Sequence, residues 1–220
     1  MEEFKEIYKS DIKKLKDIIK IINKKLNENK NIVKKFDLRK KFTGVLGEAI
    51  ALVEIFNNCG ESIKYKWKGG KNKDFDLALF YNDKIKKIQI KSSSAEDYNF
   101  QIMTKDFDRK LVKDLKKKNL KKVFKIIHKN IDSKDVDYWI FVHVRDKNIF
   151  YLLNKKQLIK LLKRVYKNYV NKERHHKYTN YGIDNSGNIR FMLKKVDKKT
   201  SKLLNKYKEN WKLLTKELFN

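Results

Sequence analysis

Three polar side chains suited to metal and phosphate chemistry lie in two short apolar segments of the chain. Asp76 precedes the apolar residues up to Tyr81, and Gln89 and Lys91 follow at the end of the segment 85–91. The Asn82–Asp83 pair between the segments is typical of a tight turn, so the two segments predict a β-hairpin. Alternate side chains of a strand share a face, which puts Gln89 and Lys91 on one face with Asp76 within reach on the partner strand.

This set of a carboxylate, an amide oxygen and an ammonium fits phosphodiester hydrolysis. Mg²⁺ takes oxygen ligands, so Asp76 and Gln89 are predicted to bind it, with Mn²⁺ as a substitute. Such a metal polarises a phosphoryl oxygen and activates a water molecule, and Lys91 offsets the charge that develops. Asp74 lies on the same strand face as Asp76 and is the alternative candidate for the metal-ligand role. Asp76 is preferred because three apolar residues, 77–79, follow it directly.

Glu48 is a further candidate metal ligand. Residues 43–56 predict a helix with Thr43 as its cap and an end at 58–60. Glu48 shares the apolar face of that helix, where a carboxylate is costly unless it is paired or binds a cation. The alternative is that Glu48 lies at the edge of the stripe and reaches water. Small residues on this face, Gly44 and Ala51, predict a close approach of another element.

The remaining pattern predicts an α/β fold with a mixed central sheet flanked by helices. An amphipathic N-terminal helix is expected over 2–27, because apolar residues recur there at steps of three and four. Residues 1–42 are expected to form a helical segment packed on the core, and 43–220 an α/β domain. Further helices are expected over 32–41, 105–130 with a break near 119, 154–170 with Gln157 completing a capping box, and one terminal helix. Strands are expected over 62–67, 100–103, 137–144, 149–153 and 189–193.

The amino-acid composition indicates which classes of binding partner the protein favours. The 220 residues carry 56 Lys and Arg against 27 Asp and Glu, a net charge of +29. A field of this sign favours a polyanion, with nucleic acid first. The other explanation is coding bias, since only six of the basic residues are Arg and the chain is rich in Asn, Ile and Tyr and has no Pro. A lone Cys59 predicts a reducing, intracellular compartment. We expect no secretory signal and no transmembrane helix, because no stretch approaches 18 uncharged apolar residues.

The arrangement resembles the PD-(D/E)xK nuclease superfamily, which includes restriction endonucleases and archaeal Holliday junction resolvases. The resemblance covers about residues 44–94 and rests on Glu48, Asp76 and the Gln89-Ile90-Lys91 triplet. It implies a restriction-endonuclease-like core in which these four residues are catalytic and Asp76, Gln89 and Glu48 hold the metal. Gln89 replaces the usual acid, as in the Mrr type of restriction nuclease, and Phe75 replaces the Pro. Similar triplets recur elsewhere in the chain, for example at 197–199. The resemblance therefore depends on the position of the Gln89-Ile90-Lys91 triplet in an apolar strand.

The resulting hypothesis is an Mg²⁺-dependent DNA endonuclease that leaves a 5′-phosphate, as the resemblance implies. Cutting both strands of a duplex would favour a homodimer. One alternative is a catalytically inactive nucleic-acid-binding protein on the same scaffold, and another is an interaction module whose lysines reflect coding bias. Adjacent His175 and His176 are expected to be surface residues or phosphate contacts, and His128 and His143 structural. Candidate nucleic-acid contacts are Ser92, Arg109, Arg174 and Lys177, together with the 105–129 helices.

Overall fold

The computed structural model describes residues 9–28, 38–60, 63–67, 75–94, 99–103, 119–145, 147–171, 182–183, 188–192 and 198–219. The chain forms two compact units. Unit 1 comprises Met1–Ser94, Val136–Leu152 and Lys208–Asn220, and unit 2 comprises Ala95–Asp135 and Leu153–Tyr207. The boundary predicted at residue 42 falls inside a helix of unit 1, Leu38–Cys59.

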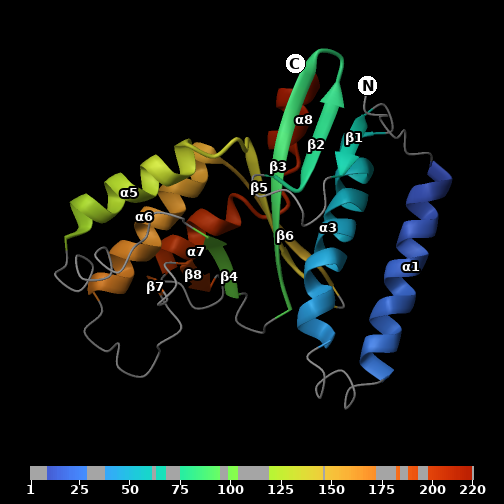
Figure 1. Ribbon diagram of the computed structural model, residues 1–220, viewed down its shortest axis with the longest axis horizontal. Helices are drawn as coiled ribbons and strands as arrows, with labels where there is room; N and C mark the ends of the chain where they lie inside the picture. The colour runs from blue at the N-terminus through green and yellow to red at the C-terminus, as the bar shows by residue number, and fades with distance from the viewer. Residues whose placement is uncertain are drawn as a thin grey trace. The chain divides into compact units, whose positions relative to one another are not determined.

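Unit 1 is built on a five-stranded sheet with the order β1-β2-β3-β5-β6 (Figure 1). Strands β1 and β2 and strands β2 and β3 pair antiparallel, whereas β3 and β5 pair parallel. The predicted α/β class with a mixed central sheet flanked by helices is therefore confirmed. The bounds are Lys64–Trp67 for β1, Leu77–Tyr81 for β2, Lys84–Ser93 for β3, Tyr138–His143 for β5 and Ile149–Asn154 for β6.

The predicted hairpin is present. Leu77 pairs with Ile88 and Tyr81 with Lys84, and Asn82 and Asp83 form the turn. Asn82 has a φ of 50°, which Asn tolerates better than most residues because its short side chain can bond locally. All six residues of β5 are buried, as its continuous apolar run predicts for a strand covered on both faces.

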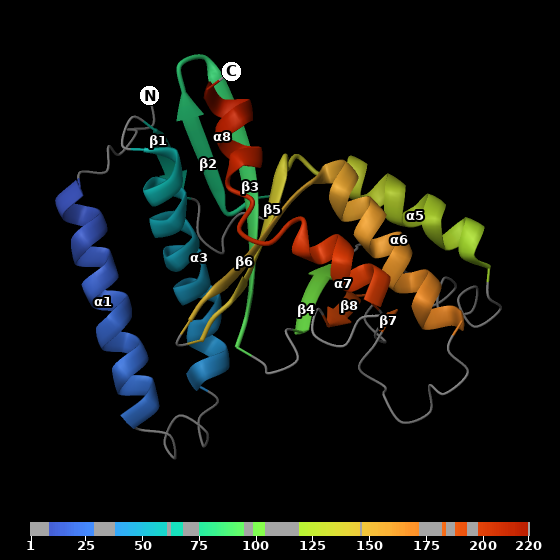
Figure 2. The same cartoon turned by 180° about the vertical axis from the view of Figure 1, so that it is seen from behind.

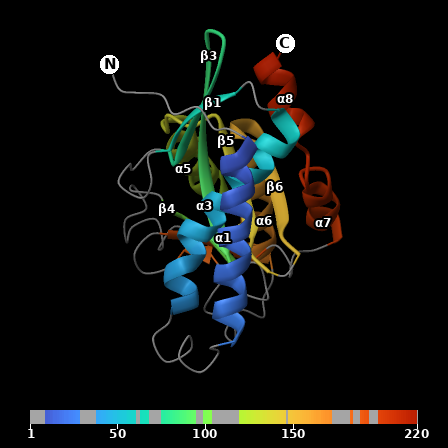
Figure 3. The same ribbon diagram turned by 90° about the vertical axis from the view of Figure 1, so that its right-hand side faces the viewer.

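Helix α3 (Leu38–Cys59) lies between the sheet and helix α1 (Lys9–Glu28), and the two helices run side by side (Figures 1 and 3). This double covering explains why α3 is apolar on most of its circumference rather than along one stripe. Its predicted end is confirmed, because Gly60 has a φ of 87° and donates from its backbone N–H to Phe56. Thr43 as a cap was wrong: the helix begins at Leu38, and the buried Thr43 hydroxyl donates to Ser94 Oγ at 3.1 Å.

Helix α8 (Lys212–Phe219) packs on the hairpin of unit 1. The rings of Tyr81 and Phe219 meet edge to face with centroids 4.6 Å apart. Lys86 of β3 is 3.2 Å from the Glu217 carboxylate. One terminal helix was expected, but the structure has two, α7 (Lys198–Asn205) and α8. Between them Glu209 takes a φ of 49°, which an α-helix does not allow.

Unit 2 combines a three-stranded sheet with helices α5, α6 and α7. The strands β4 (Asn99–Met103), β8 (Asn188–Met192) and β7 (Gly182–Ile183) pair antiparallel in the order β4-β8-β7. Helices α5 (Leu120–Asp132) and α6 (Lys155–Asn171) lie side by side (Figure 2). The capping box is confirmed: Asn154 Oδ1 accepts from the Gln157 N–H at 2.9 Å, and Gln157 Oε1 accepts from the Asn154 N–H at 3.0 Å.

A membrane-spanning helix is not found among the helices that the structure describes.

Candidate active site

The Asp76 carboxylate is bonded to β3 where the pairing with β2 stops. The ladder between β2 and β3 ends at the Leu77–Ile88 pair, while β3 continues to Ser93 beside β5. Here Asp76 Oδ2 accepts a hydrogen bond from the Ile90 N–H at 2.7 Å, and the Asp76 N–H donates to the Ile88 carbonyl at 2.9 Å. Because Ile90 lies between Gln89 and Lys91, these bonds hold the carboxylate beside both residues.

Asp76 is held in an environment that disfavours its charge. Only 6 % of the residue is exposed. Burial raises the pKa of the Asp76 carboxyl, and the positive charge of Lys91 and the Ile90 N–H lower it in part. The net direction is upward, so the ionised carboxylate is short of positive charge. A cation bound to it would supply that charge and favour the ionised form.

Gln89 is a buried amide of β3, 6 % exposed as Asp76 is. On β5 its backbone partner is Trp139, whose buried indole N–H has no acceptor within the described part of the chain. Buried polar groups are normally hydrogen-bonded, so this indole N–H is an exception. The Gln89 amide oxygen is of the type that a hard metal ion takes as a ligand.

Helix α3 approaches β3 very closely beside this set. A Cβ placed on Gly47 would lie 2.3 Å from Ser92 Cβ and 2.7 Å from its Oγ. The expectation of a close approach at Gly44 was wrong, because nothing lies within 4 Å of the corresponding point there. Ser92 is thus packed against a helix. The sequence signal, a glycine inside an apolar helix, does not separate Gly47 from Gly44 of the same helix.

Glu48 follows Gly47 and is half-buried. The helix that carries it shares a hydrophobic core with Ile88 and Ile90 of β3. Alternation along the strand then directs Gln89 and Lys91 to the opposite face. The structure brings Asp76, Gln89 and Lys91 together, and Glu48 as a metal ligand stays a prediction.

The other candidates divide into two groups. Asp74, Arg109, Arg174, His175, His176 and Lys177 lie outside the described residues. His128 is an exposed residue of α5, and His143 is a buried residue of β5, as predicted for structural histidines. Burial raises the pKa of the Cys59 thiol to about 12, so it is an unreactive thiol at neutral pH.

Within the described ranges no three residues of the His, Cys, Asp and Glu types gather closely enough to hold a metal ion. The candidate site therefore consists of one buried carboxylate, one buried amide and one ammonium. Its oxygens suit a hard cation such as Mg²⁺ and do not suit zinc, which prefers nitrogen and sulfur.

Comparison with known proteins does not assign the chain to a family. No protein-family model matches the chain, and no curated protein matches it. Among solved structures, a bacterial homing endonuclease is similar over 81 % of this chain and 92 % of its own, at 14 % identity and a TM-score of 0.38. At that score the likeness supports no conclusion about fold or function.

Proposed function

We propose that this protein is a metal-dependent DNA endonuclease whose site is formed by Asp76, Gln89 and Lys91. The observation that carries the proposal is the pair of side chains at the end of the β2–β3 ladder. The Asp76 carboxylate and the Gln89 amide are both nine-tenths buried there, and the carboxylate is short of positive charge. A divalent cation bound between the buried carboxylate and the buried amide would supply the missing positive charge and take an oxygen of each as a ligand.

Each residue has a distinct task in this site. Asp76 and Gln89 would hold Mg²⁺ or Mn²⁺, which supplies a polarised phosphoryl oxygen and a water of lowered pKa. Asp76 is fixed for this role by the Ile90 N–H. Lys91 places an ammonium where negative charge develops on the phosphate during attack. Glu48 stays a proposed third oxygen ligand although α3 covers the opposite face of β3, and the variant Glu48→Gln tests it in the same assays.

DNA is the proposed substrate because of the net charge of +29. Cleavage of both strands of a duplex would use two copies of the chain, which makes a homodimer part of the proposal. The second candidate function is nucleic-acid binding without cleavage. It is favoured by one observation, the neutral Gln89 at a position where an anionic ligand would bind the metal more tightly.

Replacing Lys91 by Met is expected to lower the rate of DNA cleavage about 10²- to 10³-fold. The reason is that one preorganised charge at the reacting phosphate is lost while the apolar stem is kept. The measurement is nicking of supercoiled DNA in Mg²⁺ and in Mn²⁺ with purified protein. Lys87→Met is the matched control, because Lys87 is also half-buried and lies four residues earlier on the same strand face.

Two results would count against this site. Equal rates for the wild type and Lys91→Met would remove Lys91 from the mechanism. The absence of metal-dependent cleavage of supercoiled, linear and branched DNA, with binding retained, would favour the second candidate function.

A further inference from the structure

Positive charge is concentrated on the helices of unit 2. Helices α5, α6 and α7 carry thirteen Lys or Arg residues and a single acid, Asp132. Helices α1, α3 and α8 of unit 1 carry twelve basic and six acidic residues, close to the ratio of 56 to 27 in the whole chain. Coding bias alone would raise the lysine content of all helices alike. The difference therefore points to a surface of unit 2 that binds polyanions.

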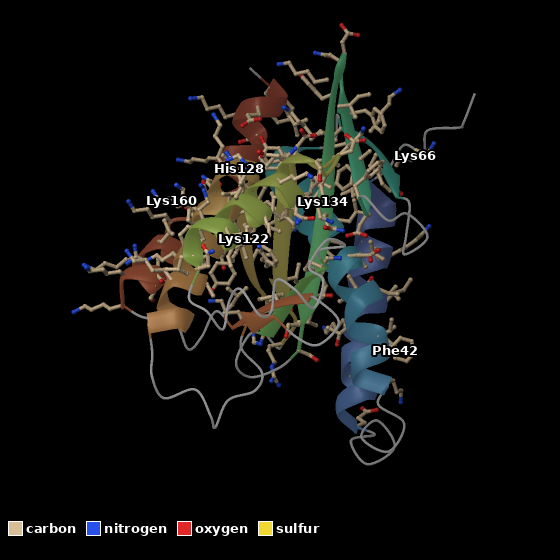
Figure 4. The ribbon with its side chains drawn as sticks, turned by 60° about the vertical axis from the view of Figure 1, so that its left-hand side comes forward. Phe42, Lys66, Lys122, His128, Lys134 and Lys160 are labelled. Atoms are coloured by element: carbon tan, nitrogen blue, oxygen red, sulfur yellow. The ribbon has the colours of Figure 1, made fainter. Side chains whose placement is uncertain are left out.

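Residues of helices α5 and α6 line an open hollow within this basic surface. Its volume is about 430 Å³, and it is lined by Phe124, Lys125, His128 and Lys129 of α5 and Lys163 of α6. On α5, Phe124 lies beside His128 and Lys125 beside Lys129, each pair being four positions apart. Figure 4 labels Lys122 and His128 on α5 and Lys160 on α6. All three of these side chains are exposed.

The lining of the hollow has an apolar floor and a charged rim. Most of its surface is apolar, supplied by the Phe124 ring and by the methylene stems of the lysines. His128 contacts the Asp132 carboxylate one turn later on α5 through its Nδ1. That contact also engages the only acid of these three helices. The lysine ammonium groups are thus left as the charges that a ligand meets.

The basic rim continues beyond the hollow along α6. Lys156, Lys160, Lys163 and Lys167 are spaced by steps of three and four, so they lie on the same helix face. The row from 156 to 167 spans about 16 Å at 1.5 Å per residue. A single small anion would need only one or two of these charges. A row of this length suits the backbone of a polymer.

We propose that the α5–α6 hollow binds single-stranded nucleic acid, with a base stacked on Phe124 and adjacent phosphates held by Lys125, Lys129 and Lys163. An aromatic floor is useful only to a base whose face is free, and a duplex hides those faces. The hollow is open to solvent, so a base can reach the half-buried Phe124 ring from outside. The inference concerns binding only and does not require the Asp76 site to cleave.

The test is binding of a labelled single-stranded oligonucleotide and a duplex of equal length to the full chain in EDTA, across a range of salt concentrations. Replacing Lys125, Lys129 and Lys163 together by Gln is expected to reduce the slope of log K against log salt by about 2 for the single strand, since each lost phosphate contact removes about 0.7. The matched control replaces Lys13, Lys20 and Lys84, three exposed lysines of unit 1, and should leave the slope unchanged.

Phe124 is tested separately from the charges. Phe124→Leu is expected to weaken single-strand binding about 5- to 150-fold at an unchanged salt slope, with duplex binding unaffected, because stacking of one base is lost. Phe124→Trp keeps a stacking face and should retain the affinity, which separates stacking from misfolding. The proposal is overturned if the two lysine triples lower the slope equally, if Leu and Trp weaken binding alike, or if Phe124→Leu weakens duplex binding as much.

Discussion

Asp76→Asn is expected to abolish metal-dependent DNA cleavage and at the same time to stabilise the folded protein. Loss of the anionic ligand removes several kcal/mol of transition-state stabilisation, which corresponds to a rate decrease of at least about 10³. The gain in stability has a separate cause. Burial raises the pKa of Asp76, so folding at neutral pH must bury a carboxylate that would be better solvated in the unfolded chain. Asparagine keeps the acceptor for the Ile90 N–H and carries no charge.

The upward direction of the Asp76 pKa shift determines how the stability difference between the variant and the wild type depends on pH. Below the pKa of an unfolded Asp, both states of the wild type bind the proton, and the variant has no advantage. Above that pKa the unfolded chain loses its proton before the folded protein does, so the wild type is progressively destabilised as pH rises toward the raised pKa of the folded state. Above the raised pKa the advantage of Asn has its full size. Each unit of pKa shift corresponds to about 1.4 kcal/mol, and each kcal/mol to about 2–4 °C in Tm for a chain of this size.

The measurement is thermal unfolding of both proteins without metal between pH 3.5 and 8, together with the nicking assay. Asp137→Asn is the control. The Asp137 carboxylate also accepts a β3 backbone N–H, that of Lys87 at 2.8 Å, but Asp137 is exposed. The Asp137→Asn variant should neither gain stability nor lose activity. An Asp76→Asn variant that is less stable than the wild type at pH 8 would show that the carboxylate is a structural group.

Gly47→Ala is expected to destabilise unit 1 by about 1–3 kcal/mol, the usual cost of overpacking. The added methyl group would lie 2.3 Å from Ser92 Cβ, so α3 and β3 would have to separate. Gly44→Ala in the same helix is the matched control. With nothing within 4 Å of its new methyl group, it should stabilise by up to about 1 kcal/mol through helix propensity. Urea unfolding of the three proteins measures both changes.

A second substitution tests the cause of the Gly47→Ala effect. Ser92→Gly removes both close atoms, and the next nearest atom, the Ser92 Cα, lies 3.6 Å from the added methyl, which is an ordinary contact. Ser92→Gly alone should cost about 0.5–1 kcal/mol as a glycine in a strand. In the Gly47→Ala background it should restore stability. Additive losses in the double variant would mean that the two residues are not in contact.

Local signals made much of the fold predictable. The β2–β3 hairpin follows from alternating apolar residues around Asn82 and Asp83, and the start of α6 follows from the Asn154–Gln157 capping box. These features depend on residues close in sequence, whose propensities act before tertiary packing. The candidate site followed from the same hairpin, because strand register places Asp76 next to Gln89 and Lys91.

Features set by distant residues were not predictable in this way. The sheet of unit 2 joins Phe100 to Phe191, and neither short strand shows which partner it will take. The division into two units depends on such pairings. Thr43 has the residue type of a helix cap, but its hydroxyl bonds to Ser94 within the packed interface of α3 and β3. The burial of Asp76 likewise depends on the surrounding fold and is not encoded in its own segment.

The central claim is tested most directly by titrating Mn²⁺ into the wild type, Asp76→Asn and Gln89→Glu in the absence of nucleic acid, with calorimetric detection of binding. If Asp76 and Gln89 hold the metal, the wild type binds Mn²⁺, Asp76→Asn does not, and Gln89→Glu binds it at least about tenfold more tightly because a second anionic ligand is added. Equal affinity of the wild type and Asp76→Asn, or weaker binding by a folded Gln89→Glu, would contradict a metal site at this end of the β2–β3 ladder.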